Sequence, residues 1–195
     1  GLFFSSRRRR TSLRIEIDDM IGVFPKHEVE GDATSKAISL RDLYHQKGQR
    51  FGTIQSMGIA AGYGEILHYL RLMLARSRFR KLPFVNDLLR VPAGIAVNIL
   101  GNAKVFVGLL EDFGYPENRL RFNAEKPDIL HIEYTRSSEL KQRRKAFRTA
   151  IRRAFKSHRK LFLSLQPELN FGHPCGTLRF GDDRKTSVLD RNCKA

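Results

Sequence analysis

The pattern of apolar and polar positions in the first third of the chain is that of strands and loops. Residues 13–18 alternate between apolar and charged side chains, which predicts a strand with one buried face. Residues 51–57 are a second strand candidate, and residues 2–4 form a short apolar run. Between the two strands, residues 22–36 are mostly polar and contain proline and glycine, so we expect a loop there.

Helical periodicity dominates the middle of the chain. In residues 65–79 apolar side chains recur every three or four positions, which predicts an amphipathic helix that ends before Pro83. Residues 84–110 are strongly apolar, but Asp87, Arg90, a proline and several glycines interrupt them, so no uninterrupted apolar run of about 20 residues exists. We therefore expect broken helices buried in the core, and no membrane span.

The last part of the chain returns to extended patterns. Residues 118–122 and 129–134 flank a Pro-Asp turn at 127–128, which predicts a hairpin. Residues 161–165 read as a short buried strand, and residues 166–195 as loop. Because strands and helices mix without a regular βαβ alternation, we expect an α+β fold, with a mixed or antiparallel sheet and flanking helices.

A long basic helix is predicted between the hairpin and the last strand. Ser137 or Ser138 supplies its N-cap, and Glu139 lies in the first turn, where the helix dipole favours an acidic side chain. Its apolar side consists of Leu140, Phe147, Ile151, Ala154 and Phe155. We expect this side to pack against the protein and the arginines to remain in water.

The net charge of +16 is concentrated in two segments. Residues 136–160 hold eleven basic residues and one acidic residue, a net +10, and the run 7–10 adds +4, which leaves +2 for the rest. The cations on the polar side of the predicted helix could contact phosphates: Arg143, Arg144, Arg148, Arg152, Arg153, Lys156 and Arg159. Nucleic-acid-binding segments usually place aromatic side chains or a recognition motif beside the charge, whereas both phenylalanines here belong to the apolar side. A solvated helix face is therefore favoured over nucleic-acid binding.

Composition indicates a folded globular chain. Hydrophobic residues make up 41% and charged residues 29% of the 195 positions. The two cysteines, Cys175 and Cys193, are too few for a disulfide scaffold and lack the spacing of zinc ligands. The chain begins with Gly1 and shows no signal-peptide pattern, so we expect a cytoplasmic protein whose start lies upstream.

Two short segments have features of ligand sites and are better explained as loops. Gly62-Tyr63-Gly64 precedes a helix, as in a dinucleotide fingerprint, but Leu67 occupies the third glycine position and would block close packing of helix and strand. Residues 27–32 group one histidine with three acidic residues, yet neither helical ligand spacing nor a second cluster supports a metal site. We expect a glycine turn and a solvated loop, and no metal.

The segment 172–177, Gly-His-Pro-Cys-Gly-Thr, carries the strongest functional signal. His173 lies between a glycine and a proline just after a predicted strand, in a loop that can approach a flat ligand. Imidazole titrates near neutral pH and can take a proton from an alcohol. A lone histidine in a loop more commonly has a structural role, and spacing alone leaves both interpretations open.

Extended to the chain end, this segment resembles a family signature. Residues 173–181 follow the pattern H-x-x-G-T-x-x-x-G, and residues 187–190 read Ser-Val-Leu-Asp. Both halves resemble the C-terminal signature of the glucose–methanol–choline (GMC) oxidoreductases, flavoenzymes that oxidise alcohols and sugars. Residues 52–56, residues 114–119 and the basic helix also resemble the substrate-binding part of these proteins, so the resemblance spans the chain and is strongest after Glu111.

The resemblance implies a role for three residues. His173 would face the flavin ring of FAD and take the hydroxyl proton while a hydride passes from the carbinol carbon to the flavin. Gly176 and Thr177 would shape the loop on the flavin side and so contribute to cofactor binding. The flavin itself would carry the redox chemistry, and the protein would position the substrate and handle the proton.

The chain also departs from the family pattern. The family's flavin-binding domain has no counterpart here, and its second catalytic side chain, an Asn or His, would lie beyond Ala195. The resemblance thus implies that residues 1–195 are the substrate-binding portion of a larger FAD-dependent enzyme for alcohols or sugars, inactive alone and completed by the flavin domain of the same protein. The alternative is a non-enzymatic basic module that binds nucleic acid or an acidic partner through residues 136–160.

Overall fold

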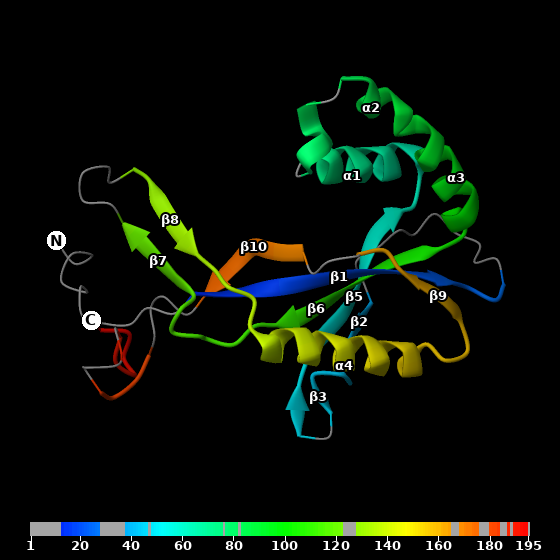
Figure 1. Cartoon of the computed structure of the whole chain (residues 1–195). Helices are drawn as coiled ribbons and strands as arrows, with labels where there is room; N and C mark the ends of the chain where they lie inside the picture. Colours follow the sequence, from blue (N-terminus) through cyan, green and yellow to red (C-terminus); the bar gives the residue numbers. More distant parts are fainter. Residues whose placement is uncertain are drawn as a thin grey trace. The chain divides into compact units, whose positions relative to one another are not determined.

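The structure, a computed structural model, describes most of the chain (Figure 1). The described residues are 13–27, 38–46, 48–75, 77–81, 83–122, 128–164, 168–175, 180–183, 187 and 189–194. The apolar run 2–4, the acidic residues of the 27–32 segment and both Gly176 and Thr177 lie outside them.

Six of the described strands form one sheet. Its order is β10-β1-β6-β5-β2, and β9 also pairs with β1. The strands are β1 (Arg14–Phe24), β2 (Ser39–Leu40), β5 (Gly52–Ala60), β6 (Lys104–Glu111), β9 (Arg159–Phe162) and β10 (Glu168–Cys175). The pairings of β1 with β10, β1 with β9 and β2 with β5 are antiparallel. The predicted α+β class, with a mostly antiparallel sheet, is confirmed.

Two small hairpins accompany this sheet. β3 (His45–Gln46) pairs with β4 (Gln49–Arg50), which the sequence did not predict. β7 (Arg119–Phe122) pairs with β8 (Leu130–Glu133), and this confirms the hairpin predicted for residues 118–134. Its first cross-strand pair is ionic, because Arg119 Nε donates to Glu133 Oε2 at 2.6 Å.

The helices follow the predicted periodicity with altered ends. α1 (Tyr63–Ala75) ends before the 3-10 turn η1 (Arg78–Lys81), and α2 (Pro83–Leu88) and α3 (Arg90–Leu100) follow. Pro83 thus opens a helix, where its missing N–H is not needed. α4 (Ser138–Ala154) is capped by Ser137, whose Oγ accepts a hydrogen bond from Leu140 N at 3.0 Å.

By their internal contacts the residues group into two compact units. Unit 1 consists of Gly1–Asp18, Leu110–Phe147 and Glu168–Ala195. Unit 2 consists of Asp19–Leu109 and Arg148–Pro167. β1, β6 and α4 each contribute residues to both units, because the boundary falls within them.

Each unit has its own buried side chains. In unit 1 the most deeply buried apolar residues are Leu13, Ile15, Ile17, Leu110, Leu140 and Phe147. In unit 2 a cluster of Ala61, Leu100, Ala103 and Val105 packs against Phe24, Met57, Ile66 and Leu163. Gly22 of β1 belongs to this packing, since a Cβ there would lie 3.5 Å from the Cβ of Ala103.

Three strands lie where the sequence predicted something else. β6 occupies residues that we expected to continue the core helices, because its β-branched and aromatic run Val105-Phe106-Val107 fits a sheet position between β1 and β5. β1 runs on to Phe24, through residues expected as loop, since pairing with β9 continues there. β10 lies in the predicted C-terminal loop. Its apolar pattern is too weak to predict a strand, and hydrogen-bonded pairing with β1 stabilises the extended conformation.

The prediction that residues 84–110 are buried core was also wrong for the helical part. Ala93 and Leu100 are buried, but Phe84, Leu88 and Val91 are each at least 60% exposed. Among the described residues, no helix combines the length and apolarity that crossing a bilayer requires. β9 also differs from its prediction, which was a short buried strand at residues 161–165. The strand covers Arg159–Phe162, and Leu161 is exposed.

Candidate functional site

His173 lies on β10, the strand at one end of the sheet order, within an irregular stretch of the pairing with β1. Arg14 pairs with Cys175 and Glu16 pairs with Asn170, so four residues of β10 stand opposite one residue of β1. A bulge of this kind bends the strand and turns a side chain out of the regular alternation. The predicted loop is therefore a bulged edge strand, and the histidine occupies the bulge.

Asn170 organises the start of the bulge. Its Oδ1 accepts a hydrogen bond from Gly172 N at 2.8 Å, and its Nδ2 donates to Asp18 Oδ2 at 3.1 Å. A Cβ on residue 172 would lie 2.9 Å from the same Oδ1. Because glycine lacks this atom, it allows the backbone before the histidine to turn back against Asn170.

Glu16 is the partner of the His173 ring. Its Oε2 lies 2.9 Å from His173 Nδ1, and the histidine side chain is 71% exposed. The neutral ring with its proton on Nδ1 donates to the carboxylate, which leaves the Nε2 lone pair to accept a proton. The hydrogen bond to Glu16 raises the pKa of His173, and the charges of Glu16 and, less strongly, Asp18 act in the same direction.

The arrangement leaves the second ring nitrogen of His173 open to accept a proton. A histidine that holds a loop together is typically buried with both ring nitrogens satisfied, whereas this ring is exposed and is held by Glu16 through Nδ1. Glu16 and Asp18 alternate with buried Ile15 and Ile17, so both carboxylates lie on the opposite face of β1 from the core. Together they place negative charge behind an open imidazole.

Leu189 and Asp190, in the second half of the signature, make backbone and side-chain hydrogen bonds within unit 1. Phe180 and Leu189 form a parallel bridge, and Gly181 N donates to Leu189 O at 2.9 Å. Asp190 Oδ1 accepts hydrogen bonds from Asn192 N at 2.8 Å and Lys194 N at 2.9 Å. Leu189 therefore pairs with the end of the histidine motif, at Phe180 and Gly181.

The prediction for the apolar side of the basic helix is confirmed in most positions. Leu140, Phe147 and Ile151 are fully buried. Phe155 is half-buried, and its ring centroid lies 5.5 Å from that of Phe106. Ala154 was wrongly placed on this side, because it is exposed.

The prediction that the helix arginines remain in water was wrong for two of them. In unit 1, Arg143 is 6% exposed, donates from Nε to Glu139 Oε1 at 2.7 Å, bonds to the carbonyl of Glu111 and stacks over Phe113. Arg143 lies three residues after Leu140 and four before Phe147, so it occupies the buried stripe. This spacing is the feature of the sequence from which the burial of Arg143 could have been predicted.

Arg148 is the second arginine of the helix that is not in water, and it belongs to unit 2. It holds both carboxylate oxygens of Asp19, through Nε at 2.8 Å and through Nη2, and also bonds to the carbonyl of Ser164. Asp19 is 1% exposed and follows the positions of Ile15 and Ile17 on the buried face of β1. A carboxylate on the core face of a strand requires a partner, and this pairing was not predicted from the sequence.

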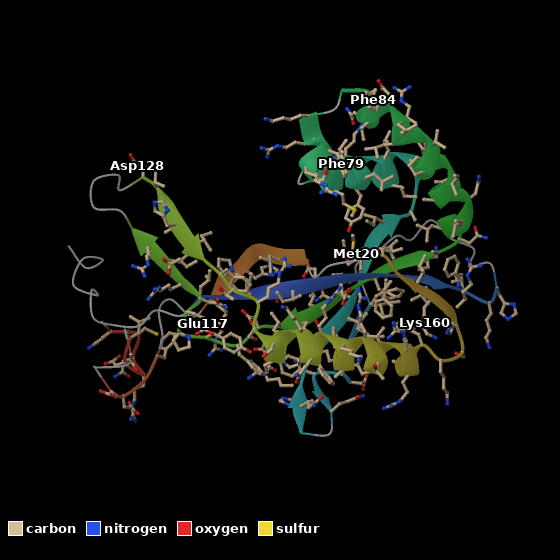
Figure 2. All side chains as sticks on the ribbon, in the orientation of Figure 1. Met20, Phe79, Phe84, Glu117, Asp128 and Lys160 are labelled. Atoms are coloured by element: carbon tan, nitrogen blue, oxygen red, sulfur yellow. The ribbon has the colours of Figure 1, made fainter. Side chains whose placement is uncertain are left out.

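The remaining cations form a smaller solvent-facing set than the sequence indicated. Arg152, Arg153, Lys156 and Arg159 are exposed, and Arg144 is half-buried. Lys160, which ends this segment (Figure 2), donates from Nζ to the carbonyls of Phe155 at 2.6 Å and His158 at 3.0 Å. It caps the C-terminal end of the helical segment, where the helix dipole favours a cation.

A buried polar cluster in unit 1 was not predicted. Tyr134 Oη donates to Asp112 Oδ2 at 2.9 Å, and Phe113 N donates to Asp112 Oδ1 at 2.9 Å. Burial raises the pKa of Asp112 despite these two bonds, and burial beside Asp112 raises the pKa of Tyr134. Nearby, Tyr115 Oη bonds to Glu139. These contacts connect the segment after β6 to the residue after β8 and to the start of α4.

Residues 62–64 are described in full, whereas only His27 of residues 27–32 is described, so the expectation for that segment stays a prediction. Gly62 leads directly into α1, and Ile66 N donates to Gly62 O at 3.0 Å, as in a glycine turn before a helix. Among the described residues, no group of three or more His, Cys, Asp and Glu side chains is placed to hold a metal ion.

Comparison with known proteins adds no assignment to this geometry. The chain matches no protein-family model and no curated protein.

Proposed function

We propose that the chain is the substrate-domain portion of an FAD-dependent oxidoreductase of the GMC type, which oxidises the CH–OH group of an alcohol or sugar. The proposal rests on the signature in residues 173–190 together with one structural observation. That observation is the exposed His173 ring, held by Glu16 through Nδ1.

The chain's own residues would handle the substrate proton. Glu16 orients the ring and fixes the neutral tautomer, in which Nε2 accepts the hydroxyl proton. The positive charge that then develops on the imidazole is stabilised by the Glu16 carboxylate at 2.9 Å. Asp18 and Asn170 support the same bulge from β1 and β10.

The residues present fit a role beside a flavin in one respect. An exposed base on an edge strand can meet a cofactor held by another part of the protein, and a bound flavin would supply the acceptor for the hydride lost by the carbinol carbon. Gly176 and Thr177, which the resemblance places near the flavin, lie outside the described residues.

The test uses the full-length protein with its flavin. Flavin reduction by a panel of primary alcohols and sugars is followed by absorbance in the parent, in His173→Ala and in His131→Ala, a control at an exposed histidine of β8. General-base assistance contributes about 10²–10⁴-fold, so His173→Ala should slow reduction by that order with flavin still bound. Reduction at the parent rate, or a full-length protein without flavin, would refute the proposal.

The basic-module alternative has a separate test. Phosphate binding weakens steeply with salt, so a DNA or RNA titration at two salt concentrations would reveal it. Two of its seven candidate cations, Arg143 and Arg148, are held by Glu139 and Asp19. This engagement leaves fewer cations of the helix available for phosphate contacts.

A further inference from the structure

α2 and α3 form an almost continuous helical run in unit 2. Leu89, between them, has helical backbone angles of φ −61° and ψ −18°. The hydrogen bonds from Leu89 N to Val85 O at 3.2 Å and from Ala93 N to Leu89 O at 3.1 Å carry the helical pattern across the junction. Ala93 and Leu100 are buried, and α1 packs against α3.

The opposite side of the same run is apolar and exposed. Its side chains follow one another at intervals of four, three, four and four residues, and they are between 49% and 65% exposed: Phe84, Leu88, Val91, Ile95 and Ile99. At 3.6 residues per turn these intervals place all five on one narrow stripe. A helix that is apolar on two opposite sides is normally covered on both.

Basic residues come just before this apolar stripe in the chain. η1 contains Arg78, Arg80 and Lys81 and an exposed Phe79, and Phe84 follows at the start of α2 (Figure 2). Residues 63–100 contain six basic and two acidic residues, a net +4. The segment therefore combines an exposed apolar stripe with positive charge.

We propose that α1, η1, α2 and α3 form a peripheral membrane-binding surface that lies in the headgroup region of an anionic bilayer. Interfacial helices of this kind carry aliphatic and aromatic side chains on one side and Lys or Arg beside them. The apolar stripe contacts the acyl chains, while the cations of η1 reach phosphates in the headgroup layer. This inference goes beyond the proposed function and does not depend on it.

A bilayer fits the two features better than a second copy of the chain or an acidic protein does. In a symmetric pairing of two copies, the same cations would face each other across the interface, and each chain carries +16. An acidic protein would pair with Arg78, Arg80 and Lys81, but it would also have to supply a matching groove for the stripe. A lipid surface can bind both the apolar stripe and the cations of η1 without a complementary shape.

The first test is co-sedimentation of the chain with vesicles. Vesicles of phosphatidylcholine alone are compared with vesicles that also contain phosphatidylserine. The double variant Phe84→Asp/Ile95→Asp should bind the anionic vesicles at least about tenfold more weakly than the parent chain. The matched control Ile38→Asp/Ile129→Asp replaces two exposed isoleucines and changes the net charge by the same amount, and it should bind within about twofold of the parent.

The second test reports insertion directly. The chain contains no tryptophan, so Phe84→Trp introduces a single fluorescent reporter on the stripe, and Ile38→Trp introduces one elsewhere. With anionic vesicles, the Phe84→Trp variant should shift its emission to the blue and be quenched by brominated acyl chains, whereas the Ile38→Trp variant should not.

Three outcomes would overturn the inference. The first is no binding to either vesicle. The second is an equal loss of vesicle binding in the two double variants, which would mean that net charge alone attracts the chain to anionic lipid. The third is a doubled mass in solution together with a blue-shifted Phe84→Trp emission without lipid, which would mean that a second copy covers the stripe.

Discussion

Glu16 Oε2 and His173 Nδ1 lie 2.9 Å apart although 157 residues separate them in the chain. The antiparallel pairing of β1 with β10 brings the two strands together, and the bulge in β10 places the ring beside the carboxylate. Since the carboxylate both orients the ring and raises its pKa, the protonation state of His173 should depend on Glu16.

Glu16→Gln should lower the pKa of His173. The amide keeps the size of the side chain but removes the charge and the strongest hydrogen-bond acceptor, so the protonated ring loses its stabilisation. Because the folded-state pKa is raised in the parent, the stabilising contribution of the protonated pair is present below the ordinary pKa and is lost as pH rises through the folded one. NMR titration of the imidazole in both chains measures the change, and an unchanged midpoint would contradict it.

Under the proposed function, the full-length protein with its flavin should show the same dependence in its pH profile. A base must be neutral to accept a proton, so flavin reduction should rise with pH through the raised pKa of His173. In Glu16→Gln the rise should move to lower pH and the plateau should fall, because a less basic imidazole is a weaker acceptor. A profile that keeps its midpoint in the variant would mean that another group is the base.

Arg148→Ala should destabilise the fold by about 3–5 kcal/mol. Removing the arginine leaves the Asp19 carboxylate buried without its bidentate partner. The exposed neighbour Arg153 is the control, and Arg153→Ala should cost at most about 1 kcal/mol. Urea unfolding measures both. The double variant Asp19→Asn/Arg148→Ala should cost less than the two single changes added together, because no unpaired charge remains.

Asp112 should make stability fall as pH rises. Its pKa is raised in the folded protein, so the folded state holds more protons than the unfolded one between the ordinary and the raised value. Its stabilising contribution is therefore complete below the ordinary pKa and is lost as pH rises through the folded one. The difference in unfolding free energy between the parent and Asp112→Asn should change across this window. A difference independent of pH would show that burial does not control this carboxyl.

Ser137→Ala should cost about 1 kcal/mol of unfolding free energy. The Ser137 hydroxyl accepts the hydrogen bond from Leu140 N at the start of α4, and alanine leaves that donor unpaired. Ser138→Ala is the matched control, because Ser138 is exposed and already inside the helix, and it should change stability by less than about 0.5 kcal/mol. If both variants lose the same unfolding free energy in thermal or urea unfolding, Ser137 is not the N-cap of α4.

The sequence predicted those elements whose local pattern agrees with their surroundings. The alternation at the start of β1, the spacing in α1 and the stripe of Leu140, Phe147 and Ile151 are all local signals, and the structure contains them. β6 was misread because its apolar residues continue those of α3, and an apolar run alone does not distinguish a strand from a buried helix.

The candidate site was predictable only in part. The signature singled out His173, but its partner Glu16 lies at the other end of the chain, and only the pairing of β1 with β10 brings the two together. Arg143 and Arg148 were misassigned to solvent because charged residues are usually exposed, whereas each lies beside a carboxylate that holds it.

The bulge in β10 also protects the protein from association through that edge. A strand at the end of a sheet offers unpaired N–H and C=O groups to any extended chain, and such edges promote aggregation. Pro174 lacks an N–H, and the bulge breaks the regular spacing of β10 just beside it. The geometry that leaves the His173 ring exposed thus makes the same edge a poor template for an added strand.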